Sequence, residues 1–137
     1  MALTANREVD HFVDQEIRRY PVAAGARIFK GGFVGLNSGK YAQALAAGDK
    51  CAGLAYDSAD NSAGGNGERY IRVYTQGDFL LPLTGATRAD IGKALYASDD
   101  ATLTFTATSN SLVGVCVDVP TSGQVILRID SYHTVAV

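Results

Sequence analysis

Apolar and polar residues alternate along most of the chain after residue 21, in short runs separated by glycines and polar turns. The run at residues 102–106 is the clearest, because Leu103 and Phe105 alternate with threonines. A period of two is typical of a strand with one buried face. The pattern predicts strands at residues 26–30, 33–36, 41–45, 51–57, 69–75, 79–83, 94–97, 102–106, 112–119 and 124–130.

Many short strands joined by glycine turns predict an all-β fold, either a compact β-barrel or a β-sandwich. The first two runs are expected to form a hairpin around Gly31 and Gly32. Residues 87–91 predict one short helical turn before Gly92. The side chains predicted to face inward are Ile28, Phe33, Leu54, Ile71, Val73, Leu103, Phe105, Val115, Leu127 and Ile129.

The two halves of the body resemble each other in three segments that recur in the same order. Residues 24–29, 52–57 and 70–73 match residues 91–96, 113–118 and 126–129. The recurrence indicates either an internal duplication, which favours a pseudo-symmetric barrel or sandwich, or a chance repetition in a glycine-rich β protein. The repeat places Arg72 and Arg128 at matched positions, on the faces of their strands opposite the apolar residues.

The first twenty residues differ from the rest, because residues 8–20 are charged and contain no glycine. Their apolar residues are spaced by three and four, as on one face of a helix. The segment is short, however, and is followed by Pro21, which equally suits an extended conformation. We expect an N-terminal arm at residues 1–20 and a single β domain at residues 21–137.

Composition and charge narrow the function classes. Apolar residues make up 47% of the chain and charged residues 19%, which is typical of a globular protein. The net charge is −2 and basic residues are not clustered, so we expect no direct binding of nucleic acid. No apolar run is long enough to span a membrane, and the charged start does not resemble a signal peptide.

Residue types that carry chemistry are few and scattered. The two histidines, His11 and His133, lie in no recognisable motif, and we expect no catalytic residue, metal site or cofactor. Cys51 and Cys116 lie in apolar runs, which favours buried reduced thiols, with one inter-strand disulfide as the alternative.

Two loops resemble ligand sites only superficially. Residues 35–41 depart from a phosphate-binding loop in glycine spacing and in the residue after the lysine, so a hairpin turn is expected there. Residues 57–68 form a polar, glycine-rich loop whose oxygen-bearing side chains either attract Ca²⁺ or are simply solvated. The spacing of these side chains does not match an EF-hand; they are Asp57, Asp60, Asn61 and Glu68.

Several segments, in their order and spacing, carry a resemblance to a known family. They are YPVAAGARIFKGGFVGL at residues 20–36, AGLAY at 52–56, YIRV at 70–73, GDF at 77–79, IGKALYASDD at 91–100 and LVGV at 112–115. Together they resemble the capsid decoration, or cement, proteins of tailed bacteriophages, over residues 20–130. The resemblance implies a structural virion protein without catalytic residues, which binds the outside of an assembled capsid and braces neighbouring major capsid protein subunits. It also implies a homo-oligomer, with a trimer favoured, made in the host cytoplasm.

The arm is the expected capsid-binding element, because it combines apolar anchors with flanking charges; packing on its own barrel as a lid is the alternative. The candidate contacts are Arg7, Val9, Asp10, Phe12, Val13, Ile17, Arg18 and Arg19. Arg72 and Arg128 are candidates for a subunit interface, with plain solvation as the alternative. Two other functions stay open: a β-barrel module that binds a small ligand or host glycan, and a tail or fibre component.

Overall fold

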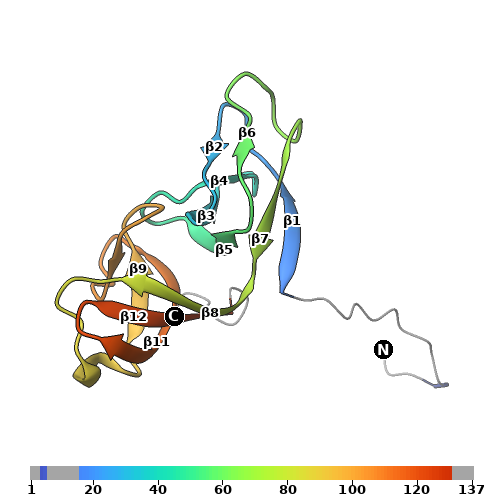
Figure 1. The fold of residues 1–137 in the computed structure, drawn as a ribbon. Coiled ribbons are helices and arrows are strands. Elements are labelled where there is room, and N and C mark those ends of the chain that lie inside the picture. The colour runs from blue at the N-terminus through green and yellow to red at the C-terminus, as the bar shows by residue number, and fades with distance from the viewer. Residues whose placement is uncertain (1–3, 6–15, 131–137) are drawn as a thin grey trace.

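The computed structural model describes residues 4–5 and 16–130 and confirms the all-β fold class (Figure 1). Two five-stranded antiparallel sheets and one two-stranded sheet make up this part of the chain. The first sheet has the order β1 (Ile17–Pro21), β7 (Tyr70–Tyr74), β5 (Lys50–Ala55), β3 (Phe33–Leu36), β4 (Ala42–Ala44). The second has the order β10 (Leu103–Thr104), β9 (Ala94–Ala97), β11 (Ser111–Thr121), β12 (Gln124–Asp130), β8 (Gln76–Pro82). The short pair is β2 (Arg27–Ile28) with β6 (Ala59–Asp60), and both large sheets are open.

The first sheet is the middle layer of the molecule, because its central strands are buried on both faces. In β5, Cys51 and Leu54 pack with the second sheet, whereas Ala52 and Ala55 pack on the opposite side. That opposite side is covered by residues 22–28 and β6, which we call the outer layer. The core between the outer layer and the first sheet consists of Val22, Ile28, Val34, Ala42, Ala52, Ala55, Ile71 and Val73.

Eight of the ten side chains predicted to face inward are buried, and two are not. Phe105 is only partly buried and packs at the rim of the core between the large sheets. Val115 is 38% exposed, so its inward placement is wrong. The reason is a register shift between Leu112 and Gly114 in the pairing with β9, since one extra residue reverses the alternation beyond it.

The predicted hairpin of residues 26–30 and 33–36 is also wrong. Strand β2 pairs with β6, whereas β3 pairs with β4 and β5. Gly31, with φ of +84°, turns the chain from the outer layer into the middle layer instead of folding it back on itself. The predicted hairpin turn at residues 35–41 is confirmed: the Asn37 side chain accepts a hydrogen bond from the Tyr41 amide at 3.0 Å, between β3 and β4.

The predicted helical turn is confirmed as a 3-10 helix, η1 (Arg88–Asp90). The Asp90 carboxylate accepts a hydrogen bond from the Thr87 amide at 3.0 Å, which satisfies a donor at the start of this turn. Two strands were not predicted, β6 and β1. Because β1 comprises Ile17–Pro21, the last residues of the expected arm lie in the first sheet, opposite β7.

Strands β7 and β8 form one nearly continuous run that passes from the first sheet to the second (Figure 1). Only Thr75 separates them, and its amide donates a hydrogen bond of 2.7 Å to the Glu16 carbonyl. The next residue, Gln76, lies opposite Asp130 at the end of β12. The described chain therefore enters and leaves the body at the same junction.

The sequence repeat has a structural counterpart in two matched strand pairs, β5 with β7 and β11 with β12. Gly53 in β5 and Gly114 in β11 occupy the same place in these pairs, because a Cβ at either position would overlap a carbonyl oxygen of the neighbouring strand. The remaining matched segments differ, since β2 joins the outer layer and β9 joins the second sheet.

Candidate interaction surface

An exposed patch of arginines and tyrosines lies on the part of the first sheet around β1 and β7. Residues Tyr70 and Arg72 alternate along β7 with the buried Ile71 and Val73, so both project from the other face. Arg19 of β1 lies directly opposite Arg72. We call this patch the arginine–tyrosine surface; it consists of Arg19, Tyr56, Asp57, Tyr70 and Arg72.

Two guanidinium groups opposite each other on neighbouring strands repel unless other groups compensate their charge. The Arg72 Nε donates a hydrogen bond of 2.8 Å to Asp57, and its guanidinium lies over the Tyr56 ring, 4.7 Å from the centroid. The hydrogen bond to Asp57 raises the pKa of Arg72 above its ordinary value. The Arg19 guanidinium lies 4.1 Å from the centroid of the Tyr70 ring. Aromatic faces and one carboxylate thus hold both cations in place.

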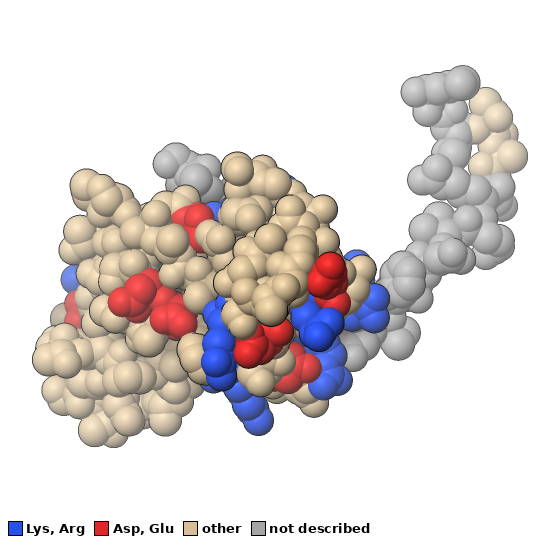
Figure 2. Space-filling model, turned by 90° about the horizontal axis from the view of Figure 1, so that it is seen from above, with Lys and Arg blue, Asp and Glu red and all other residues tan. Residues whose placement is uncertain are grey.

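The patch is tied to the core through stacked aromatic rings. The Tyr56 ring meets Tyr74 edge-on at 5.2 Å, and Tyr74 lies 5.2 Å from Phe79, which packs against the core between the sheets. These contacts fix the position of Tyr56, and Tyr56 in turn supports Arg72. Seen from above, basic and acidic side chains intermix on one part of the molecule, while wide areas carry neither (Figure 2).

The predicted capsid-contact residues divide into two groups. Ile17, Arg18 and Arg19 lie on β1, where Ile17 is half-buried and both arginines are exposed. The remaining five fall outside the described residues; they are Arg7, Val9, Asp10, Phe12 and Val13.

The predicted interface pair, Arg72 and Arg128, is exposed as expected but lies on different sheets. Arg128 donates hydrogen bonds of 2.8 and 2.9 Å to the two carboxylate oxygens of Asp78, on the neighbouring strand β8. The hydrogen bond from Arg128 holds the pKa of Asp78 below its ordinary value. Each arginine is therefore engaged by a carboxylate of its own chain, and the structure does not bring the two together.

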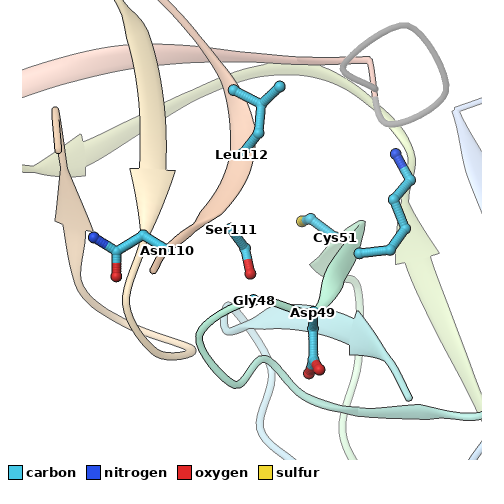
Figure 3. Close-up of a pocket in the computed structure, with 7 residues that line it drawn as sticks. Gly48, Asp49, Cys51, Asn110, Ser111 and Leu112 are labelled. Carbon is cyan, nitrogen blue, oxygen red and sulfur yellow. The ribbon is translucent and has the colours of Figure 1, made fainter. Parts of the chain in front are cut away.

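A pocket of about 200 Å³ opens between the turn before β5 and the start of β11 (Figure 3). In Figure 3 the Cys51 sulfur points toward the strand end that carries Ser111, whose hydroxyl points toward the turn at Gly48. The Ser111 hydroxyl donates to the Ala46 carbonyl at 3.3 Å. The pocket is smaller than typical ligand sites of about 300–1,000 Å³.

Both cysteines are free and buried, which confirms the prediction of buried reduced thiols and not that of an inter-strand disulfide. Burial raises the pKa of Cys51 to about 12, and burial also raises the pKa of Cys116. The thiolate is the reactive form of cysteine, so these thiols are inert near neutral pH.

Within residues 4–5 and 16–130, no three acidic, histidine or cysteine side chains gather as a metal site. In the same ranges, no helix has the length and apolar character needed to cross a bilayer.

A family model described as phage cement protein matches residues 12–130, which is most of the chain. The chain belongs to the phage cement protein family. Membership implies a capsid-stabilising protein of the virion, in a structural family whose members are typically not enzymes. The resemblance predicted over residues 20–130 is thereby confirmed. No curated protein and no solved structure matches the chain.

Proposed function

We propose that this cement protein binds the outer surface of an assembled phage capsid and bridges neighbouring subunits of the major capsid protein. The observation that carries the proposal is the arginine–tyrosine surface, in which exposed side chains are held in fixed positions by stacking and by one ion pair. Tyrosine and arginine are among the residue types that most often dominate binding energy at protein interfaces.

Preorganisation is the physical reason why this surface suits a contact with a large, rigid shell. Arg19 and Tyr70 lie on paired strands, and the Arg19 guanidinium stacks on the Tyr70 ring. Little side-chain freedom therefore remains to be lost on binding. In the described part of the chain, no carboxylate forms an ion pair with Arg19. Its guanidinium is therefore available to a carboxylate or a backbone carbonyl of the capsid protein.

The arm supplies a second proposed contact. Its candidate residues before β1 combine apolar anchors with charges, and β1 itself carries Arg19 of the arginine–tyrosine surface, two residues after its start at Ile17. The two contacts therefore adjoin along the chain. Two adjoining contacts on one rigid body, repeated in an oligomer, gain affinity through effective concentration.

Binding to capsid shells that lack the protein tests the first contact. We expect the double variant Arg19→Ala/Tyr70→Ala to bind such shells about tenfold more weakly or worse, because two anchoring side chains are lost. The matched control, Arg88→Ala/Ile91→Ala, removes an exposed arginine and an exposed apolar residue at η1, away from the surface. Equal binding by both variants, each with an unchanged melting temperature, would place the capsid contact elsewhere.

Binding to the same shells distinguishes the contribution of the arm from that of the body. A chain starting at residue 16 keeps all of β1, and we expect it to retain the melting temperature of the full chain but to leave the shells more readily. A large fall in melting temperature with binding preserved would instead show that the arm packs on its own body as a lid.

We also propose that the protein acts as a homo-oligomer, with a trimer favoured. Strand β8 is an edge of the second sheet and carries Leu80, which is 56% exposed, while β4 and β10 are edges as well. Exposed edges and apolar side chains are commonly covered by a symmetric neighbour. Light scattering on the free protein, and the symmetry of decorated shells, measure the state; a monomer in both settings contradicts the proposal.

A further inference from the structure

Asn61 lies at the centre of the 57–68 loop and is only 2% exposed, although the loop is polar. Its side-chain amide nitrogen donates hydrogen bonds to three carbonyl oxygens, those of Val22 at 3.3 Å, Ala23 at 2.9 Å and Gly65 at 2.9 Å. Three acceptors around one atom fix which end of the amide is nitrogen, because the reverse orientation would turn oxygen toward oxygen. The Oδ1 atom of Asn61 therefore points away from these three carbonyl oxygens.

That Oδ1 atom is buried and accepts no hydrogen bond. It faces Gly64, where a Cβ would overlap it and would also lie 2.7 Å from Oε2 of Glu68. The amide oxygen and the carboxylate oxygen therefore border the same small space. The Glu68 carboxylate itself has no hydrogen bond or ion pair with any residue in the described part of the chain.

Two oxygen atoms that only accept hydrogen bonds thus lie near Gly64, and neither has a hydrogen-bond donor in the described part of the chain. A buried acceptor without a partner costs folding free energy, and native structures rarely leave one unsatisfied. Two arginines of this region already have other partners: the Arg69 guanidinium donates to the Glu68 carbonyl at 3.2 Å, and Arg27 pairs with Asp60 at 3.8 Å. A pocket of about 210 Å³ is lined by residues that include Asn61, Gly64, Glu68 and Arg69.

We propose that this pocket binds a calcium ion, with Asn61 Oδ1 and the Glu68 carboxylate as its protein side-chain ligands. Calcium takes six to eight oxygen ligands in flexible geometry, and carboxylate, amide and water oxygens are its usual partners. The pocket offers no nitrogen or sulfur ligand, which argues against zinc. With one charged ligand, the site belongs with weak extracellular calcium sites, whose Kd is about 10⁻⁴–10⁻³ M.

Calcium in this position would brace the loop that is hydrogen-bonded to the outer layer. The loop backbone already holds that layer: the Asn61 amide donates to Ala26 at 2.9 Å, and the Gly67 amide donates to Val22 at 2.9 Å. An ion shared by Asn61 and Glu68 joins two points of the same loop across Gly64. Binding to the folded state alone raises stability in proportion to the logarithm of ligand concentration.

The melting temperature of the free, full-length protein tests the site. At about 10 mM CaCl₂, the expected Kd shifts the folding equilibrium by about 10- to 100-fold relative to EDTA, a rise of about 4–10 °C. Sodium chloride at equal ionic strength is the reference, because it screens surface charges without providing a ligand. No rise above that reference would overturn the proposal and leave a buried water as the partner of Oδ1.

Variants decide whether the response comes from this site. Glu68→Gln removes the charged ligand, and its new amide can donate to Oδ1, so we expect an undiminished melting temperature in EDTA and no response to calcium. Asp57→Asn makes the same charge change in the same loop, at a residue engaged with Arg72, and should keep the response. Gly64→Ala places a Cβ against Asn61 Oδ1 and should abolish the calcium response. An equal calcium response in the wild type and in Glu68→Gln would refute the site, and none of these measurements depends on capsid binding.

Discussion

The variant Gly53→Ala is expected to lose about 3 kcal/mol or more of folding free energy, because an added Cβ has no room. A Cβ at this position would overlap the Tyr74 carbonyl oxygen and lie 2.9 Å from a methyl group of Val73. The backbone φ of +142° is also one that side chains with a Cβ rarely adopt. Relief requires that β5 and β7 separate, and both strands are central to the first sheet.

Urea unfolding followed by circular dichroism measures this loss. The matched control is Gly39→Ala, where φ is not positive and the nearest atom, in the Tyr41 ring, lies 3.4 Å from the added Cβ. We expect the control to stay within about 1 kcal/mol of the wild type. Gly114→Ala should resemble Gly53→Ala, because its Cβ would overlap the Arg128 carbonyl. Similar losses in Gly53→Ala and Gly39→Ala would contradict the packing described for β5.

Truncation of Ile71 to alanine is expected to cost about 2–5 kcal/mol through the cavity that it leaves. Ile71 is fully buried and lies in the core beneath the outer layer, where its neighbours include Ile28 and Val34. Since β7 is paired on both sides, with β1 and β5, its backbone has little freedom to move into the space.

Thermal and urea unfolding of Ile71→Ala, compared with Phe29→Ala, give the test. Phe29 is 56% exposed, so its truncation removes a larger side chain with little effect on the core. Phe105→Ala should fall between the two, because Phe105 is partly buried. A loss at Phe29 equal to that at Ile71 would show that the outer layer is not packed as described.

Sequence patterns predicted the strands best where one face is buried and the other is solvated. In β7, the alternation of Ile71 and Val73 with exposed residues identified the strand and its inward side chains. Strand β1 was not predicted, because adjacent arginines at 18 and 19 interrupt any alternation and because its apolar spacing resembles a helix. Only its pairing with β7 makes it a strand, and that pairing joins residues 49 to 57 positions apart.

The candidate surface was predictable only in part, for a similar reason. The alternation in β7 predicted that Arg72 is exposed, but its contacts with Asp57 and Tyr56 depend on how the chain returns after β5. The stacking of Arg19 on Tyr70 depends on the register of β1 with β7. Asn61 was grouped with solvated loop residues, since a glycine-rich polar segment gives no sign that one of its amides is buried.

The junction of β7 and β8 gives the fold a circular connectivity. Glu16 lies opposite Thr75 and Asp130 lies opposite Gln76, so the first and last paired residues of the body are neighbours along one strand run. A short peptide joining residue 130 to residue 16 would therefore close the backbone into a ring without disturbing a strand pair. Such a ring could be reopened at an exposed turn, such as residues 37–40 between β3 and β4, to give a circular permutant with every native strand intact. New chain ends, and any guest domain fused to them, would then emerge at the β3–β4 turn instead of at the junction.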